Sequence, residues 1–227
     1  MTLQQNLTAV ESRIAAACHQ AGRPRHEVRL LAVSKTHPGA RLREAYQAGL
    51  REFGENRVQE LTSKATELAD LDLRWVMIGH VQRNKAAAVA RAAAEVQSLD
   101  SLELAEALDR RLQAAGRALK VLVQVNTSGE ASKSGLAPDQ TLGFAERLSR
   151  YTALQPQGLM TIALPSPDPA PVAACFDRLR DLRHQLRDRF GGGWDELSMG
   201  MSGDLELAIE RGSTCVRVGT AIFGSRP

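Results

Sequence analysis

Hydrophobic and polar positions along the 227-residue chain follow two alternating patterns. Short apolar runs with strand character occur in eight places, and longer segments with apolar residues at helical spacing separate them. An additional amphipathic helix opens the chain at Leu3, and Gly22 with Pro24 ends it. The predicted strands are 29–34, 51–53, 74–78, 95–99, 119–125, 154–160, 195–199 and 214–218, and the predicted helices between them are 39–48, 57–70, 82–94, 101–115, 138–150, 169–189 and 203–211.

This order of elements predicts an α/β protein. Alternating strands and helices form parallel sheets, and eight strands favour closure into a (β/α)₈ TIM barrel. No linker, repeat or low-complexity segment divides residues 1–227, and the Pro-rich stretch 165–171 is interpreted as a loop. We therefore expect a single barrel domain, with the extra N-terminal helix covering the barrel floor.

Polar residues gather directly after the predicted strands, whereas the strand starts show nothing comparable. Because all strands of such a barrel end at one rim, these residues are expected to meet at one pocket. They are Lys35-Thr36-His37, Gly54-Glu55-Asn56, Gly79-His80, Asp100-Ser101, Asn126-Thr127-Ser128, Thr161, Met201-Ser202-Gly203 and Gly219-Thr220.

Lys35 is the most informative of these residues. It ends an apolar run and precedes a Pro-containing turn, so it stands where a strand meets the rim. A partly desolvated lysine there can lose its proton and form a Schiff base with a carbonyl compound. The alternative is a solvated lysine at a strand end. The chain has five lysines against 24 arginines, and arginine cannot do this amine chemistry.

Two Gly-containing turns predict a phosphate site. The segment 198–204 follows the seventh strand and opens a helix, and the segment 218–224 follows the eighth. Loops seven and eight form the usual phosphate site of this barrel, and free amides at a helix start favour anions. Ordinary helix capping is the alternative. Asp204 and Glu206 would repel a phosphate, so we expect both on the outer side of their helix.

Two other basic residues are candidates. Arg217 alternates with two valines on the eighth strand, so it points into the barrel if the valines point outward. It then needs either an anionic ligand or an acidic neighbour. Lys133 lies in the polar loop 126–135 after the fifth strand, and a solvated loop is the alternative there.

Composition excludes several classes of function. The net charge is +3, aromatic residues are few and no lysine-rich run exists, which argues against nucleic-acid binding. No apolar stretch approaches the ~18 residues of a membrane span, and the N-terminus lacks a signal pattern. The histidines show no metal-ligand spacing, so no metal is expected. Cys18, Cys175 and Cys215 are widely spaced, which indicates reduced thiols and a cytoplasmic protein.

Taken together, these motifs resemble the pyridoxal phosphate homeostasis protein family, single-domain relatives of the alanine racemase N-terminal barrel (fold type III). The resemblance covers about residues 1–225. The matching segments are Ala32–Thr36, Phe53–Asn56, Ile78–Gln82, Asn84-Lys85, Ser128–Glu130, Ser132–Gly135, Gly158–Thr161, Leu197–Asp204 and Arg217–Gly224.

The resemblance implies a vitamin B6 cofactor, pyridoxal 5'-phosphate, held covalently by Lys35 as an internal aldimine. It further implies that Arg217 faces the pyridine nitrogen. Arginine only donates hydrogen bonds, so the nitrogen would stay unprotonated and would be a poor electron sink. Asn56 would lie near the ring, and the phosphate would bind Met201, Ser202, Gly219 and Thr220. Apart from the resemblance, the composition of the loop after the fifth strand predicts Lys133 as a secondary cofactor contact, because a flexible ammonium there lies on the same rim as Lys35.

Three functions remain open. The first is a non-catalytic carrier and buffer in cofactor homeostasis, a monomer that passes the cofactor to apo-enzymes. The second is an amino-acid racemase, although Tyr46 and Tyr151, the only candidates for a second base, fall in helical segments and the racemase C-terminal domain is missing. The third is a Schiff-base aldolase, which would need an inward carboxylate and a second lysine. The carrier is favoured.

Overall fold

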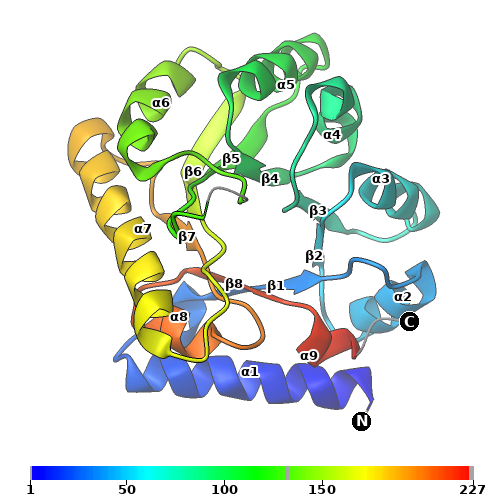
Figure 1. Cartoon of the computed structure of the whole chain (residues 1–227). Helices are drawn as coiled ribbons and strands as arrows, with labels where there is room; N and C mark the ends of the chain where they lie inside the picture. Colours follow the sequence, from blue (N-terminus) through cyan, green and yellow to red (C-terminus); the bar gives the residue numbers. More distant parts are fainter. Residues whose placement is uncertain (1, 131–132, 225–227) are drawn as a thin grey trace.

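The computed structural model describes residues 2–130 and 133–224, which form a closed barrel of parallel strands (Figure 1). Each strand pairs with its neighbours in chain order, and β8 pairs with β1 to close the ring. This confirms the predicted fold class. The strands are β1 (Arg29–Val33), β2 (Glu52–Glu55), β3 (Arg74–Met77), β4 (Glu95–Leu99), β5 (Leu119–Gln124), β6 (Leu154–Met160), β7 (Glu196–Ser198) and β8 (Cys215–Val218).

Helices surround the barrel, and their buried apolar residues form one cluster with those of the strands. The α-helices of the described chain are α1 (Leu3–Gln20), α2 (Gly39–Gln47), α3 (Val58–Glu67), α4 (Ala86–Ala92), α5 (Leu102–Ala114), α6 (Thr141–Leu148), α7 (Pro169–Phe190), α8 (Leu205–Glu210) and α9 (Thr220–Phe223). Three 3₁₀ turns accompany them: η1 (Arg25–Glu27), η2 (Arg83–Lys85) and η3 (Pro138–Gln140).

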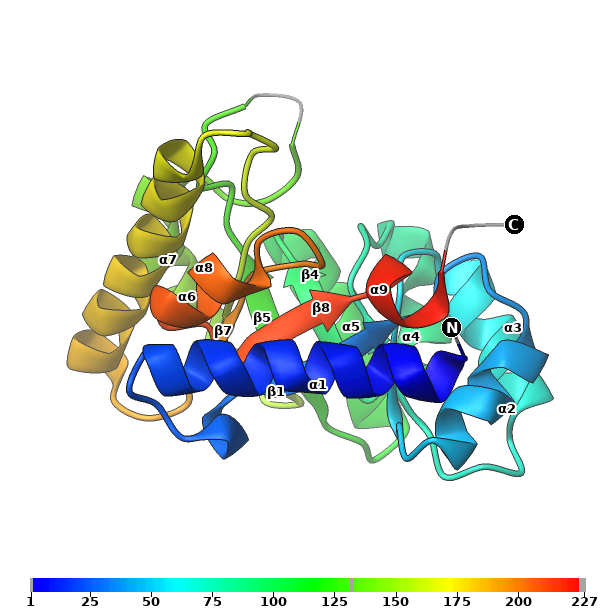
Figure 2. The ribbon, with the colours of Figure 1, turned by 90° about the horizontal axis from the view of Figure 1, so that it is seen from below.

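The extra helix α1 does not cover the barrel floor, so that prediction is wrong. Figure 2 shows α1 along the outer side of the barrel, and it contacts α8, α9 and α2. Asn6 donates to the carbonyl of Ile222 at 3.0 Å, and Arg13 pairs with Glu206 at 2.7 Å. The reason is length: α8 and α9 span six and four residues, too few to cover β8 and β1. The apolar face of α1 fills that space.

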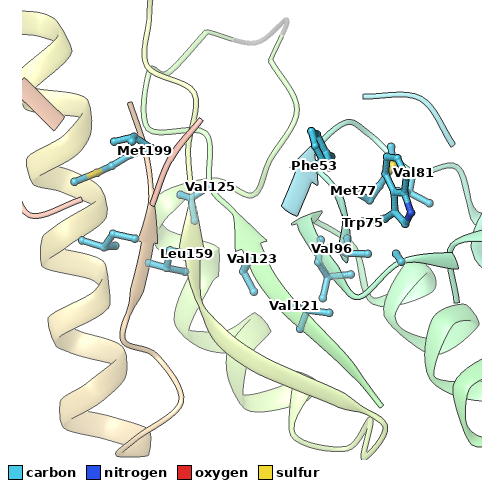
Figure 3. Close-up of a cluster of buried hydrophobic side chains, with 14 of the residues drawn as sticks. Phe53, Trp75, Met77, Val81, Val96, Val121, Val123, Val125, Leu159 and Met199 are labelled. Atoms are coloured by element: carbon cyan, nitrogen blue, oxygen red, sulfur yellow. The ribbon is translucent and has the colours of Figure 1, made fainter. Parts of the chain in front are cut away.

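The main hydrophobic core lies between the strands and the helices. Phe53, Trp75 and Met77 on one side, and Val121 and Val123 on another, are buried in this layer (Figure 3). A second, smaller cluster lies inside the barrel and consists of Leu31, Val33, Val76, Ile78 and Cys215.

The rest of the barrel interior is polar, which the sequence analysis missed. Arg29 donates to Glu95 at 2.8 Å and pairs with Glu52 and Glu196 at 3.1 and 3.0 Å. These residues come from the starts of four strands, so the strand starts do carry charged groups. Glu95 is an inward carboxylate of the kind that the aldolase alternative needs, but Arg29 neutralises it at the end of the barrel opposite the rim.

Candidate functional site

A cavity of about 280 Å³ opens at the rim where the strands end. It contains every residue that the sequence analysis assigned to the cofactor except Lys133. Lys35 enters from the end of β1, Asn56 from the end of β2, and Arg217 from β8. The complete lining is Val33, Lys35, His37, Asn56, Ile78, Ile162, Met201, Ser202, Gly203, Arg217, Gly219, Thr220 and Gly224.

The backbone on both sides of Lys35 is tied to one charged cluster. Thr36 has a left-handed φ of 68°, an uncommon conformation for a non-glycine residue. Its N–H donates to Glu60 at 2.8 Å, which holds that conformation. On the other side, Ser34 donates its hydroxyl to Glu55 at 2.6 Å, and its carbonyl accepts from Lys64 at 2.8 Å.

Lys64 joins the two carboxylates of this cluster. Its Nζ lies 2.6 Å from Glu55 and 3.2 Å from Glu60, and the Glu55 side chain is fully buried. Burial raises the pKa of Glu55, and the bonds from Lys64 and Ser34 offset part of that effect. Although burial also opposes the charge of Glu60, the bonds from Thr36 and Lys64 lower its pKa below the ordinary value. The cluster thus fixes the turn from which Lys35 enters the cavity.

The turn after β7 presents a hydroxyl and two amides. Gly200 has a φ of 94°, and a Cβ there would lie 2.5 Å from Ala208, so only glycine fits. The N–H groups of Ser202 and Gly203 donate to no other described residue, and both residues line the cavity. The Met201 N–H is already used, because it donates to Asp204 at 2.5 Å. Asp204 therefore lies inside the turn, contrary to expectation, whereas Glu206 points outward to Arg13.

Arg217 reaches the cavity as a buried cation with 4% of its surface exposed. It donates to Ser198 Oγ at 2.6 Å and to the Thr161 carbonyl at 2.7 Å. No carboxylate of the described residues lies within ion-pair distance of it, so the alternative of a structural ion pair is not observed. Burial lowers the pKa of Arg217, and the interactions with Cys215 and Asp204 offset only part of that effect.

Lys133 lies outside this cavity, in a neighbouring one of about 270 Å³ that shares Asn56, Ile78 and Ile162 with it. Its Nζ pairs with Glu130 at 2.5 Å and donates to the Ala163 carbonyl at 3.2 Å. The segments after β5 and β6 rise together from the rim (Figure 2). Two residues of the predicted loop motif, Ala131 and Ser132, lie outside the described residues.

Several lining residues were assigned no role from the sequence. His37 was expected at the rim pocket without a specific contact. It is buried beside Lys35, and its ring stacks on Phe223 at 5.0 Å. Ile78 and Ile162 gave no signal in the sequence, because an apolar residue at a strand end is usually predicted to be part of the hydrophobic core. Within the ranges 2–130 and 133–224, no group of three acidic, histidine or cysteine side chains could hold a metal ion.

The fold and this rim pocket define a class. Residues 5–227 match the model of the alanine racemase N-terminal domain, so the chain belongs to that family of barrels. Within it, the chain belongs to the pyridoxal phosphate homeostasis proteins. It is 48% identical to the protein of that name from Pseudomonas aeruginosa over 99% of this chain and 96% of the relative. It is 39% identical to the one from Escherichia coli, over 99% and 97%.

Solved structures agree with this assignment. PipY of Synechococcus elongatus, solved with PLP bound, is 38% identical, with a TM-score of 0.86 over 98% of this chain and all of PipY. A structure described as an unknown protein from Bifidobacterium adolescentis is 40% identical, with a TM-score of 0.92 over 97% and 94% of the two chains. Alanine racemase of Clostridium difficile is 15% identical, and this chain covers 57% of it with a TM-score of 0.78, which shows a shared fold alone.

Proposed function

We propose that this protein binds pyridoxal 5'-phosphate and acts in cofactor homeostasis as a carrier and buffer. One observation carries the proposal: a single cavity unites a lysine, a buried unpaired arginine and two hydroxyl-bearing turns. Those groups match the three chemical features of the cofactor, which are an aldehyde, a pyridine nitrogen and a phosphate. The bound cofactor of the relative PipY supports the proposal.

The residues present fit this group. Ser202 and Thr220 would hold the phosphate together with the free N–H groups of the β7 turn. Gly219 contributes by its small size, because a Cβ there would lie 3.0 Å from the Val33 carbonyl. Arg217 would face the ring nitrogen, and Asn56 would lie beside the ring. Met201 would contribute through its exposed side chain, since its N–H is occupied.

Lys35 would hold the cofactor covalently. In its neutral form the Nζ lone pair attacks the aldehyde carbon, a carbon–nitrogen double bond forms and one water leaves. The bound aldehyde supplies an electrophilic carbon, and Arg217 limits its use as an electron sink because arginine cannot protonate the ring nitrogen. The site is therefore better suited to holding the cofactor than to turning over amino acids.

The positions of the two tyrosines also favour carriage over racemisation. Tyr46 lies in α2 with the Arg51 guanidinium 3.8 Å above its ring. Tyr151 lies between α6 and β6, at the end of the barrel opposite the rim, not in a helix as expected. Neither lines the cavity. A racemase needs a second base on the far side of its cofactor, and the described residues offer no tyrosine for that role.

The test is hydrogen exchange at the α-carbon. The loaded protein is incubated with L-alanine or L-serine in deuterated water, and deuterium and D-isomer are measured. We expect little of either. Turnover on the order of 1 per second or faster, the range of ordinary enzymes, would contradict the carrier proposal.

We also propose that Lys133 is a secondary contact during loading or release. It lies in the adjoining cavity on a loop at the same rim, and its ammonium can attract a phosphate. Lys133→Ala should then leave equilibrium binding intact but slow handover to an apo-enzyme. Lys133→Arg should transfer like wild type if charge matters and like the alanine variant if amine chemistry matters. Unchanged rates in both variants would refute this role.

The remaining expectations concern the protein as a whole. We propose that it acts in the cytoplasm as a monomer and that apo-enzymes needing the cofactor are its partners. Among the described residues, no helix is both long and apolar enough for a membrane span. Cys18, Cys175 and Cys215 are buried free thiols, which suits a reducing compartment.

A further inference from the structure

A continuous chain of hydrogen bonds runs inside the barrel from Arg217 at the cavity to Glu95 near the floor. Arg217 Nη1 donates to Ser198 Oγ at 2.6 Å, and the Ser198 hydroxyl donates to Gln97 Oε1 at 2.6 Å. Gln97 Nε2 donates to Glu95 Oε1 at 2.7 Å. Arg29 closes the chain with bonds of 2.8 and 3.0 Å to the two oxygens of Glu95.

The chain crosses the interior of the barrel. Gln97 and Glu95 come from β4, whereas Ser198 and Arg217 come from β7 and β8 on another side of the ring (Figure 1). Gln97 and Ser198 are fully buried, and Glu95 is 1% exposed. Water therefore does not compete for these bonds, and each group depends on its neighbour in the chain.

The direction of every bond is fixed by elementary chemistry. The Glu95 carboxylate, paired with Arg29, only accepts, so the Gln97 amide must turn its nitrogen toward it. The Gln97 carbonyl then faces Ser198 and takes its single hydroxyl proton. With that proton committed, Ser198 offers a lone pair to Arg217. Gln97 and Ser198 therefore each turn an accepting oxygen toward the Arg217 end of the chain.

This polarity helps to stabilise the buried charge of Arg217, to which the Thr161 carbonyl also offers an acceptor. Arg217 has no carboxylate within ion-pair distance among the described residues. A buried cation without an anion is costly unless oriented dipoles replace its hydration. Ser198 and Gln97 supply those dipoles and connect Arg217 to the negative charge of Glu95.

We propose that Gln97 and Ser198 are positioning residues that fix Arg217 as a donor toward the ring nitrogen of the cofactor. This inference rests on the proposed function, since it assumes that a pyridine ring occupies the cavity. A donor held in this place keeps the ring nitrogen unprotonated. Loosening the arginine should let that nitrogen gain a proton more easily, so the pH midpoint of the bound ring should rise.

The test uses pyridoxine 5'-phosphate, which carries the same ring and phosphate but an alcohol instead of the aldehyde. Its binding does not need the covalent bond to Lys35, so it reports on Arg217 separately. Dissociation constants and the ultraviolet absorption of the bound ring are measured across pH. Gln97→Leu should weaken binding about 5- to 10-fold, the scale of one lost hydrogen bond, and should raise the pH midpoint.

Three further variants separate positioning from stability. Ser198→Ala removes one oxygen atom and should give the same upward shift of the pH midpoint. It therefore provides the test if Gln97→Leu folds poorly. Gln97→Glu should restore the wild-type spectrum near neutral pH. Burial and the neighbouring Glu95 would keep the new carboxyl protonated, and that form can donate to Glu95 and accept from Ser198. Val76→Ala, inside the apolar half of the barrel, is the matched control and should lose stability without moving the midpoint.

The outcomes are distinct. An upward shift in Gln97→Leu and Ser198→Ala, with recovery in Gln97→Glu, supports the inference. If Gln97→Leu and Ser198→Ala both keep the wild-type pH midpoint and affinity, the inference is overturned while cofactor binding stands. A wild-type protein that binds neither pyridoxine phosphate nor pyridoxal phosphate overturns the proposed function and the inference together.

Discussion

Neither Glu55 nor Lys64 lines the cavity, yet both determine where Lys35 stands. Ser34 and Thr36, the neighbours of Lys35 in the chain, bond to a buried cluster of two carboxylates and one ammonium. A reactive amine needs a fixed position, and here the backbone rather than the side chain is held. The position of Lys35 thus depends on a charged cluster that fixes its backbone.

Removing the ammonium of Lys64 should lower the free energy of unfolding measurably. Lys64→Met leaves Glu55 buried without its cation, and breaking a buried pair in this way costs about 3–5 kcal/mol. The double variant Glu55→Gln/Lys64→Met removes both charges and should recover most of that loss. Urea unfolding of the three proteins measures the difference. A double variant no more stable than the single one would contradict the role of the pair.

The carboxylate of Glu60 makes the stability of the turn depend on pH. Its folded pKa lies below the ordinary value of about 4.3, so its contribution is complete above that pH and is lost as the pH falls through the folded pKa. The difference in free energy of unfolding between wild type and Glu60→Gln should therefore be constant near neutrality and shrink in acid. A difference that stays constant down to pH 3 would contradict the assignment.

At the scale of elements, the spacing of apolar residues and the positions of turn residues predicted most of the fold. The strands 95–99 and 154–160 match β4 and β6 residue for residue. The second strand was placed at 51–53 but spans Glu52–Glu55, because a glutamate beside a glycine reads as a turn. Glu55 is instead a buried strand residue whose partner, Lys64, lies on α3. Local pattern cannot reveal such a partner, since it shows no long-range contact.

The two turns after β7 and β8 should carry the affinity for phosphate. Ser202→Ala or Thr220→Val should weaken pyridoxal phosphate binding by about 1–3 kcal/mol, the scale of a lost bond to a charged group. Pyridoxal, which lacks the phosphate, should bind poorly to wild type and change little in either variant. Calorimetry with both compounds checks this. Equal affinity of wild type for the two compounds would exclude a phosphate site.

At the scale of the whole molecule, the pocket was predicted and the barrel interior was not. The seven residues proposed for the cofactor line one cavity, and such a pocket could be predicted because strand ends of a barrel meet at one rim. The polar chain from Arg29 to Arg217 could not be predicted, because its members lie on four strands and, apart from Arg217, each has the local pattern of an ordinary polar residue. The same limit explains α1: its amphipathic pattern shows that one face is buried, but not which surface it covers.

The central claim is that Lys35 holds the cofactor covalently, and reduction tests it most directly. The protein is loaded with pyridoxal phosphate, treated with borohydride and digested, and the pyridoxyl group is located by mass spectrometry. We expect the group on the peptide containing Lys35, its loss in Lys35→Ala, and no change in the control Lys120→Ala at the start of β5. An undiminished pyridoxyl group in Lys35→Ala, attached to another lysine, would contradict the account.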